Sequence, residues 1–400
     1  MAMVKMNQPL NDICVIEFGA SVAGAACTKT FSDYGARVIK VEPYDGGKLR
    51  RIPPFKNDVP NINGGAFHLA FDSGKESIVV DFSSNSGLAI IKELYKLADL
   101  VIYDLPPTKI ETLQLVLDKK SGPSTVSITP HGLQGPYKDR LENDISTLAW
   151  TTRMYRNSIE NQQPLRNAPE STLVQIGHTA AAVGIGIYWG HQHDNVRRDA
   201  EVAGVEAVLG NVDTGFVSWV FTGNLPQRIG GQLKTRYPTG IYPCKNGYIV
   251  LSANEEPWFS RLCNAIGHPE ILKDKRFTEY REDNWEAFMT YLGPYLKKHD
   301  KNYIFTHLQE HGVMVAPVLN ASDLLNDPQA IARKSFIEIK DDRNGNFYFA
   351  GAPFHMNQIN DRSFQLMTAP ELGMHTNDVL SEIGYSANEI IALFRAGVVG

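Results

Sequence analysis

The sequence has no surplus of basic residues. It contains 39 lysine and arginine residues against 44 aspartate and glutamate residues, with a formal net charge of −5, and the basic residues are scattered along the chain. Proteins that bind nucleic acid gather positive charge on the surface that follows the phosphate backbone. We therefore expect no nucleic-acid partner.

Long apolar runs are also missing. The longest, residues 179–190, falls well short of the roughly 20 residues that a membrane-spanning helix needs. Residues 1–10 contain no apolar stretch of the kind that forms the centre of a secretory signal. We expect a cytoplasmic protein without a membrane partner.

Cysteine and the common catalytic motifs are scarce. The four cysteines, Cys14, Cys27, Cys244 and Cys263, are widely spaced and form no CxxC pair, so we expect reduced thiols and no metal site. The chain has no GxSxG elbow, no HExxH helix and no P-loop. The commonest hydrolase, metalloprotease and nucleoside-triphosphatase interpretations are thereby removed.

The first half of the chain alternates strand and helix patterns. Apolar runs at 13–18 and 37–42 flank a helical pattern at 22–34, which predicts a βαβ unit. The alternation continues with strands at 77–81, 100–103 and 125–128 and helices at 84–97 and 109–117. This order predicts an α/β fold with a Rossmann-like, doubly wound parallel sheet.

The pattern changes in the second half. Residues 179–190 and 202–220 have the apolar spacing of long helices, and 240–251 predicts a β-hairpin. Further predicted elements are helices at 257–266, 283–297 and 302–311, a strand at 313–318, a hairpin at 336–350 and helices at 376–383 and 387–395. We predict a large Rossmann-like domain over 1–220, a smaller α/β domain over 221–350, and a C-terminal segment over 351–400 that returns to the large domain.

A glycine-containing turn follows the first predicted strand. Gly19 and Gly24 are the only glycines of this turn, so they do not make the GxGxxG spacing of a dinucleotide fingerprint, and Glu42 closing the second strand is weak support by itself. A tight strand-to-helix turn is the plainer interpretation. The helix that starts there could still receive a phosphate or the adenosine end of a nucleotide-like ligand.

Segments spread over the whole chain share the pattern of one family. They are 9–18, 33–43, 74–81, 98–102, 132–137, 238–253, 326–333 and 372–380. In this order they resemble the class III CoA-transferases, the CaiB/BaiF-like family, and their relatives the α-methylacyl-CoA racemases. The resemblance implies a Rossmann-like large domain built from both ends of the chain, a smaller α/β domain between them, and an interlocked dimer.

Gln175 departs from that family at its most important position. Residues 173–182 resemble the turn and helix that open with the family's catalytic aspartate, and Gln175 occupies the aspartate's place. In the family the carboxylate attacks an acyl-CoA thioester to give a mixed anhydride and then an enzyme-bound CoA thioester. An amide is neither nucleophilic nor able to leave again, because its nitrogen lone pair is delocalised into the carbonyl. The resemblance therefore implies that this chain has no catalytic residue at the family's site.

Other family positions are changed as well. Pro43, Thr112 and Thr129 stand where relatives often carry basic or polar residues that hold CoA. In the racemase branch a histidine and an aspartate move the α-proton; the histidine's place is taken by Asn143 and the aspartate's again by the glutamine. Glu256 matches a third acidic residue of that branch, but this one match does not support a racemase.

Three functions remain open. The first is the non-catalytic subunit of a heteromeric class III CoA-transferase, whose homologous partner keeps the aspartate and moves CoA from an acyl-CoA, such as succinyl-CoA, to an organic acid, such as the benzylsuccinate of toluene degradation. The second is a self-sufficient CoA-transferase that uses another carboxylate, Glu170 or Glu256. The third is a binding or regulatory protein that holds a CoA ester or a nucleotide without turnover, or a dinucleotide enzyme built on a similar sheet.

The resemblance also indicates where a CoA moiety would bind. The backbone around Ser21 and Val22, with Val80, Asp104 and Leu105, is predicted to line an adenine-sized slot. We expect no tightly bound cofactor, and CoA or a CoA thioester only as a possible substrate.

Overall fold

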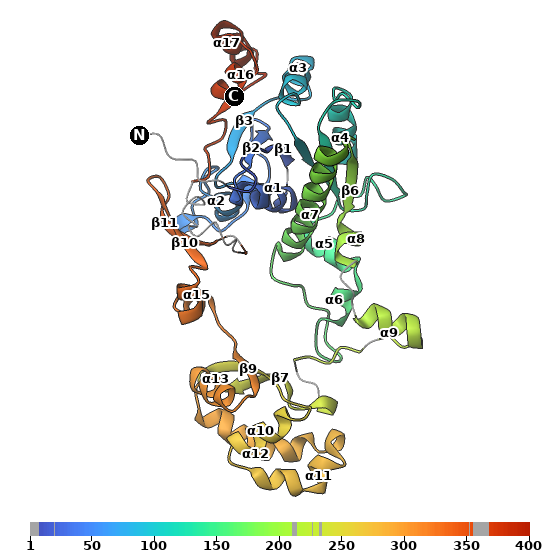
Figure 1. The fold of residues 1–400 in the computed structure, drawn as a ribbon, viewed down its shortest axis with the longest axis vertical. Helices are drawn as coiled ribbons and strands as arrows, with labels where there is room; N and C mark the ends of the chain where they lie inside the picture. The colour runs from blue at the N-terminus through green and yellow to red at the C-terminus, as the bar shows by residue number, and fades with distance from the viewer. Residues whose placement is uncertain are drawn as a thin grey trace. The chain divides into compact units, whose positions relative to one another are not determined.

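The computed structural model describes residues 8–19, 21–209, 214–225, 227–231, 234–351, 353–354 and 368–400. The chain divides into two compact units (Figure 1). The first comprises Met1–Arg153, Arg166–Phe216 and Ala332–Gly400, and the second comprises Met154–Leu165 and Val217–Ile331.

The centre of the first unit is a six-stranded sheet in which all neighbouring strands are parallel. Its order is β3-β2-β1-β4-β5-β6, the order of the dinucleotide-binding folds. The strands are β1 (Cys14–Gly19), β2 (Arg37–Glu42), β3 (Glu76–Val79), β4 (Leu100–Asp104), β5 (Ser124–Thr129) and β6 (Asp199–Ala203). The predicted parallel α/β sheet is confirmed.

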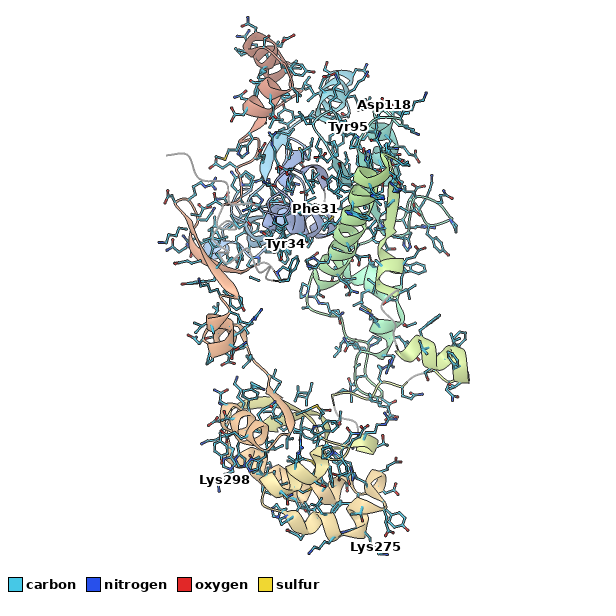
Figure 2. The ribbon with its side chains drawn as sticks, in the orientation of Figure 1. Phe31, Tyr34, Tyr95, Asp118, Lys275 and Lys298 are labelled. Atoms are coloured by element: carbon cyan, nitrogen blue, oxygen red, sulfur yellow. The ribbon has the colours of Figure 1, made fainter. Side chains whose placement is uncertain are left out.

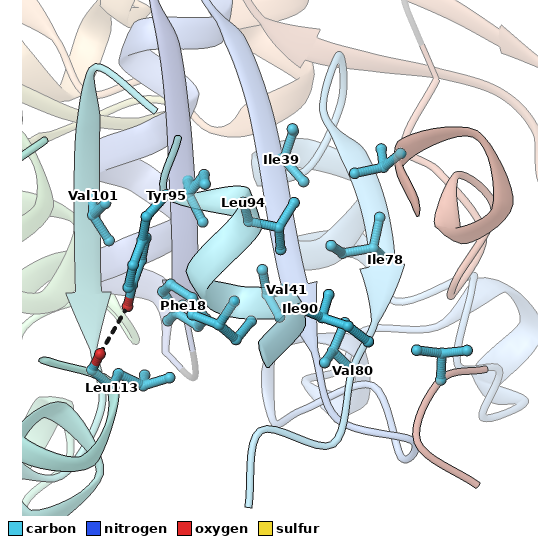
Figure 3. Packing of buried hydrophobic residues seen from close by; sticks show 14 of the residues in the cluster. Phe18, Ile39, Val41, Ile78, Val80, Ile90, Leu94, Tyr95, Val101 and Leu113 are labelled. Atoms are coloured by element: carbon cyan, nitrogen blue, oxygen red, sulfur yellow. Dashed lines mark hydrogen bonds between the residues drawn. The ribbon is translucent and has the colours of Figure 1, made fainter. Parts of the chain in front are cut away.

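Helices cover both faces of this sheet. The helices of the first unit are α1 (Val22–Asp33), α2 (Ala66–Phe71), α3 (Asn85–Leu94), α4 (Pro107–Gln114), α5 (Asp144–Ala149), α7 (Ser171–Asp194), α8 (Gly204–Leu209), α16 (Thr376–Glu382) and α17 (Ala387–Arg395), while α6 (Thr152–Arg156) and α9 (Thr214–Thr222) lie where the chain passes from one unit to the other. On one face, Phe18, Val41 and Ile78 of the strands pack against Ile90 and Leu94 of α3 (Figure 3).

The other face is covered by α1 and α7, which approach closely. A Cβ at Gly177 of α7 would lie 2.4 Å from the Ala23 carbonyl oxygen of α1, and a Cβ at Gly184 would lie 3.1 Å from the Phe31 ring. Phe31 and Tyr34 lie at the C-terminal end of α1 (Figure 2). The two glycines stand seven positions apart, so they lie on the same face of α7 and let the backbones meet. This close contact with α1 fixes the position of α7 against the sheet.

A cluster of buried charges joins the first three strands. Lys75 Nζ lies 2.8 Å from Glu17 and 3.0 Å from Asp72, and Lys40 Nζ lies 2.8 Å from Asp72. Burial raises the pKa of Asp72, but the two lysines outweigh it and lower that pKa well below its usual range. Removing one member would leave an unpaired buried charge.

The cluster continues through a neutral histidine. His68 Nδ1 lies 2.8 Å from Asp72 Oδ2, so it carries the hydrogen and donates, and Nε2 accepts from Arg50 Nη1 at 3.0 Å. Burial lowers the pKa of His68, which keeps the ring uncharged. Arg50 in turn makes two hydrogen bonds of 2.7 Å to Glu42. Arg50 also donates to the Pro370 carbonyl oxygen, which ties the C-terminal segment to this cluster.

The second unit has its own core. An antiparallel sheet of β7 (Thr239–Cys244), β8 (Gly247–Ser252) and β9 (Met314–Pro317) packs against helices. These helices are α10 (Trp258–Ala265), α11 (Lys275–Thr278), α12 (Trp285–Lys298) and α13 (Lys301–Glu310), and two short helices, α14 (Ala321–Leu325) and α15 (Pro328–Ala332), follow β9 in the chain. In the part of the chain that the structure describes, no helix is long and apolar enough to cross a membrane.

Two details of the sequence prediction are corrected. Residues 202–220, predicted as one helix, contain the end of β6 and the separate helices α8 and α9, with 210–213 outside the described residues. The hairpin of β10 (Phe336–Asp341) and β11 (Gly345–Ala350), assigned from sequence to the small domain, belongs to the first unit. Hydrogen bonds from Lys56 to the Asn344 carbonyl and from Asn344 to the Asn63 carbonyl hold it there.

The contact between α1 and α7 predicts different effects for two glycines of one helix. Gly177→Ala forces the helices apart and should lower the free energy of unfolding by about 1–3 kcal/mol. Gly186 has open space around its Cβ position, so Gly186→Ala should raise stability by up to about 1 kcal/mol through helix propensity. Urea denaturation checks both. Equal changes in the free energy of unfolding would contradict the close contact between α1 and α7 at Gly177.

Candidate functional site

A cavity of about 400 Å³ opens at the carboxyl end of the parallel sheet. It lies beyond the carboxyl ends of β1, β4 and β5. The strand order reverses at β1, with β2 and β3 on one side and β4, β5 and β6 on the other. Ligands of open α/β sheets bind at such a switch point. The lining includes Ser21 after β1, Asp104 and Leu105 at the end of β4, and Thr129 and Pro130 at the end of β5.

The side-chain carboxylate of Asp104, at the end of β4, lies at the N-terminus of α1. Its Oδ2 accepts hydrogen bonds from the Ser21 backbone N–H (2.9 Å), the Ser21 hydroxyl (2.6 Å) and the Gly24 backbone N–H (2.9 Å). The Ala23 N–H is used as well, by the Ser21 hydroxyl oxygen. A helix N-terminus can bind an anion through its free N–H groups. Here the protein's own carboxylate fills that place, which argues against a dinucleotide phosphate there.

Gly24 is required by this arrangement, because a Cβ would lie 2.6 Å from the Asp104 Cβ. Burial raises the pKa of Asp104 above its usual value, although the hydrogen bonds from Ser21 and Gly24 oppose the shift. The carboxylate therefore holds β4 to α1 at the cost of some desolvation.

The cavity combines apolar walls with a few charges. Pro106, Pro107, Ile128, Leu141 and Ile176 supply apolar surface. Lys48, Lys138 and Arg140 are its cations, and Asp139 and Glu142 add carboxylates beside the buried Asp104. Three cations from two separate loops are suited to a ligand with several negative charges.

The five residues predicted to contact CoA are only partly brought together. Ser21, Asp104 and Leu105 line the cavity. Val22 is buried against Ala25 and Leu49, and Val80 is buried in the core on the other face of the sheet. CoA contact by these residues stays a prediction.

Helix α7 forms one wall of the cavity, through Leu173 and Ile176. Gln175, between them in sequence, is directed elsewhere: its Oε1 accepts a hydrogen bond from Arg153 Nη1 at 3.1 Å. The start of α7 is held by Asp144, whose Oδ1 accepts from the Thr172 N–H at 2.9 Å. From Ser171 to its last residue, Asp194, the helix contains no other carboxylate. The part of α7 that lines the cavity therefore carries no carboxylate.

The two alternative carboxylates occupy unlike places. Glu170 is the N-cap of α7 with a left-handed φ of 63°, and its pKa is raised by burial and by the nearby Asp144. Glu256 belongs to the second unit and accepts a 2.6 Å hydrogen bond from the Ser260 hydroxyl. Neither residue lines the cavity.

Three of the four residues predicted to stand at changed family positions make local hydrogen bonds. Thr129 accepts from the Gly132 N–H, Thr112 donates to the Thr108 carbonyl, and Asn143 caps α5 by accepting from the Ser146 N–H. Pro43 is exposed after β2.

The sequence did not single out the cavity's cations. Lys138 and Arg140 directly follow the matched segment 132–137, which was the available signal, whereas Lys48 lies outside every matched segment. In the described residues, no group of three or more histidine, cysteine or acidic side chains is arranged to hold a metal ion.

Comparison with known proteins identifies the family. The family model described as CoA-transferase family III matches residues 10–376. The chain belongs to CoA-transferase family III. Members of this family use CoA thioesters as substrates, so the cavity lies in a protein of the CoA-transfer class.

Two relatives match along almost their whole lengths. The succinyl-CoA:(R)-benzylsuccinate CoA-transferase subunit BbsE of Thauera aromatica is 27% identical and covers 98% of this chain and 99% of its own length. The succinyl-CoA–D-citramalate CoA-transferase of Chloroflexus aurantiacus is 24% identical, with 99% of each chain covered.

Among solved structures, a CaiB/BaiF family protein from Brucella suis superposes with a TM-score of 0.81 at 22% identity, covering 94% of this chain and 100% of that one. This likeness confirms the α/β fold of a CoA-transferase family III member.

The environment of Asp104 predicts a pH effect on stability. Because its folded pKa is raised, the native state holds the proton more tightly than the unfolded state, and this contribution is lost as pH rises from about 4, the unfolded value, through the folded pKa. Asp104→Asn keeps an acceptor oxygen but cannot titrate. The free energy of unfolding of the variant, relative to wild type, should therefore grow between pH 4 and pH 7. A difference that is constant with pH would refute the assignment.

Proposed function

We propose that this chain is the non-catalytic subunit of a heteromeric class III CoA-transferase. In this proposal a homologous partner subunit supplies the catalytic aspartate and transfers CoA from an acyl-CoA to an organic acid. The observation that carries the proposal is the α7 wall, which has Gln175 bonded to Arg153 and no carboxylate before Asp194. In this proposal the residues Pro43, Thr112, Thr129 and Asn143 have also departed from the family's pattern, as Gln175 has.

The chemistry requires the partner. The covalent route needs an oxygen that attacks the thioester and is later displaced. Loss of such a nucleophile typically lowers turnover by a factor on the order of 10⁴ or more. If two such chains build the assembly and only one performs the covalent steps, the other still needs the intact fold. This explains why the fold is kept although the nucleophile is missing.

Exposed apolar residues support an obligate assembly. Helix α9 presents Trp219 and Phe221 with exposed fractions of 49% and 84%, together with Val220. Large exposed apolar side chains gathered on one helix are a feature of protein interfaces. We propose that such surfaces are covered in an interlocked dimer with the homologous subunit.

The relatives support a choice of substrates. The two described above both carry succinyl-CoA in their names, and the more similar of them is a subunit of an enzyme that acts on (R)-benzylsuccinate. We propose succinyl-CoA as donor and benzylsuccinate or a similar organic acid as acceptor, in the cytoplasm and in a route such as toluene degradation.

Reconstitution tests the proposal. The chain is purified alone, and also together with a homologous chain that keeps an aspartate on the helix equivalent to α7, and transfer from succinyl-CoA to benzylsuccinate is followed. We expect no transfer by this chain alone and activity from the pair. Gln175→Met in the pair should change kcat by less than about threefold, because no covalent step uses the amide.

Full activity from this chain alone would refute the non-catalytic role. In that case Glu170→Gln and Glu256→Gln identify which carboxylate, if either, acts instead. Activity of the pair with other acids but not with benzylsuccinate would refute only the choice of acceptor.

A further inference from the structure

The loop between β5 and α5 carries two of the cavity's three cations. It runs from Pro130 to Glu142 and includes Lys138 and Arg140. Its backbone begins against the sheet, where the Leu133 N–H donates to Glu201 at 3.0 Å. Beyond that point the loop contains Gly135, whose φ is 93° and whose Cβ position has open space around it. The middle of the loop is therefore not fixed by packing at this glycine.

The two ends of the loop are joined by one carboxylate oxygen. Glu142 Oε1 accepts from His131 Nε2 at 3.1 Å and from Trp150 Nε1 at 3.0 Å. The His131 and Glu142 side chains are both only 8% exposed. Since a carboxylate only accepts, the His131 hydrogen lies on Nε2. The bond connects the second residue of the loop with its last.

Aromatic rings support the same junction. The His131 ring meets the Trp150 ring edge to face, with centroids 5.2 Å apart, and Tyr137 from the middle of the loop lies 5.4 Å from Trp150. Trp150 follows α5 directly and is outside the loop. The loop is thus closed on itself and fixed to α5 through one set of contacts.

Glu142 is suited to hold the loop rather than to bind the ligand. Its carboxylate lies in the wall of a cavity that has three cations, where an unneutralised negative charge would repel an anionic ligand. Burial raises the pKa of Glu142, but hydrogen bonds from Ser146, His131 and Trp150 outweigh burial and lower it below its usual value. These donors offset its charge.

We propose that Glu142 is a positioning residue that closes the Pro130–Glu142 loop through His131 and Trp150 and so holds Lys138 and Arg140 toward the ligand of the cavity. Without this closure, binding would have to order the loop, and that loss of conformational entropy lowers affinity. The proposal rests on the proposed function only in taking the ligand to be a CoA moiety.

The test compares four variants of the full-length chain. Glu142→Ala removes the acceptor, Glu142→Gln keeps an acceptor oxygen without the charge, and Trp150→Phe removes one donor but keeps an aromatic side chain. Asp139→Asn is the matched control, since it removes an exposed carboxylate from the same loop and the same cavity. Binding of free CoA is measured by calorimetry, and hydrogen exchange of the amides in 131–142 is measured without ligand.

We expect Glu142→Ala to accelerate exchange in 131–142 and to weaken CoA binding by about tenfold, the loss of roughly one or two such hydrogen bonds. Trp150→Phe should have a smaller effect of the same kind. Glu142→Gln should stay within about threefold of wild type in both measurements, and Asp139→Asn should leave exchange unchanged.

Three results would overturn the proposal. One is unchanged exchange in Glu142→Ala, which would mean that the loop does not need the closure. Another is weak CoA binding by Glu142→Gln with wild-type exchange, which would make Glu142 a direct ligand contact. The last is amide exchange in 131–142 that is accelerated as much by Asp139→Asn as by Glu142→Ala. If wild type binds no CoA, the ligand assignment of the proposed function fails, and exchange alone decides whether Glu142 closes the loop.

Discussion

The hydrogen bonds that Asp104 accepts from Ser21 and Gly24 determine how the switch point of the sheet is built. They hold the end of β4 to the start of α1, and the cavity opens beside them. They also use the N–H groups that a Rossmann fold offers to a phosphate. A ligand of this protein must therefore find its countercharges on the surrounding loops, where Lys48, Lys138 and Arg140 lie.

The buried charges that stabilise the first unit lie apart from Gln175 and the α7 wall of the cavity. Buried ion pairs of Lys40 and Lys75 with Asp72 hold the first three strands together, and Arg50 extends the cluster to the C-terminal segment. Gln175 lies on α7, outside this cluster, where it bonds to Arg153. A substitution at Gln175 should therefore leave the interactions of this buried cluster undisturbed.

The sequence predicted the elements whose residues are buried on both sides and missed those fixed by distant contacts. Strands β1 to β5 were found, whereas β6, which contains Asp199 and Glu201, was missed and its last two residues were assigned to a helix, because its pairing with β5 is not visible locally. The backbone around Ser21 and Val22 stays a predicted CoA contact; the Val22 side chain itself is buried against Ala25 and Leu49. The bond between Gln175 and Arg153 depends on α6, which the sequence did not indicate.

Covalent trapping during turnover shows which subunit carries the nucleophile. The reconstituted pair is incubated with succinyl-CoA, the enzyme-bound acyl or CoA ester is captured with hydroxylamine or borohydride, and the modified peptides of both subunits are identified by mass spectrometry. The account predicts modification of a carboxylate in the partner subunit and an unmodified peptide around Gln175 in this chain. A trapped carboxylate anywhere in this chain would contradict it.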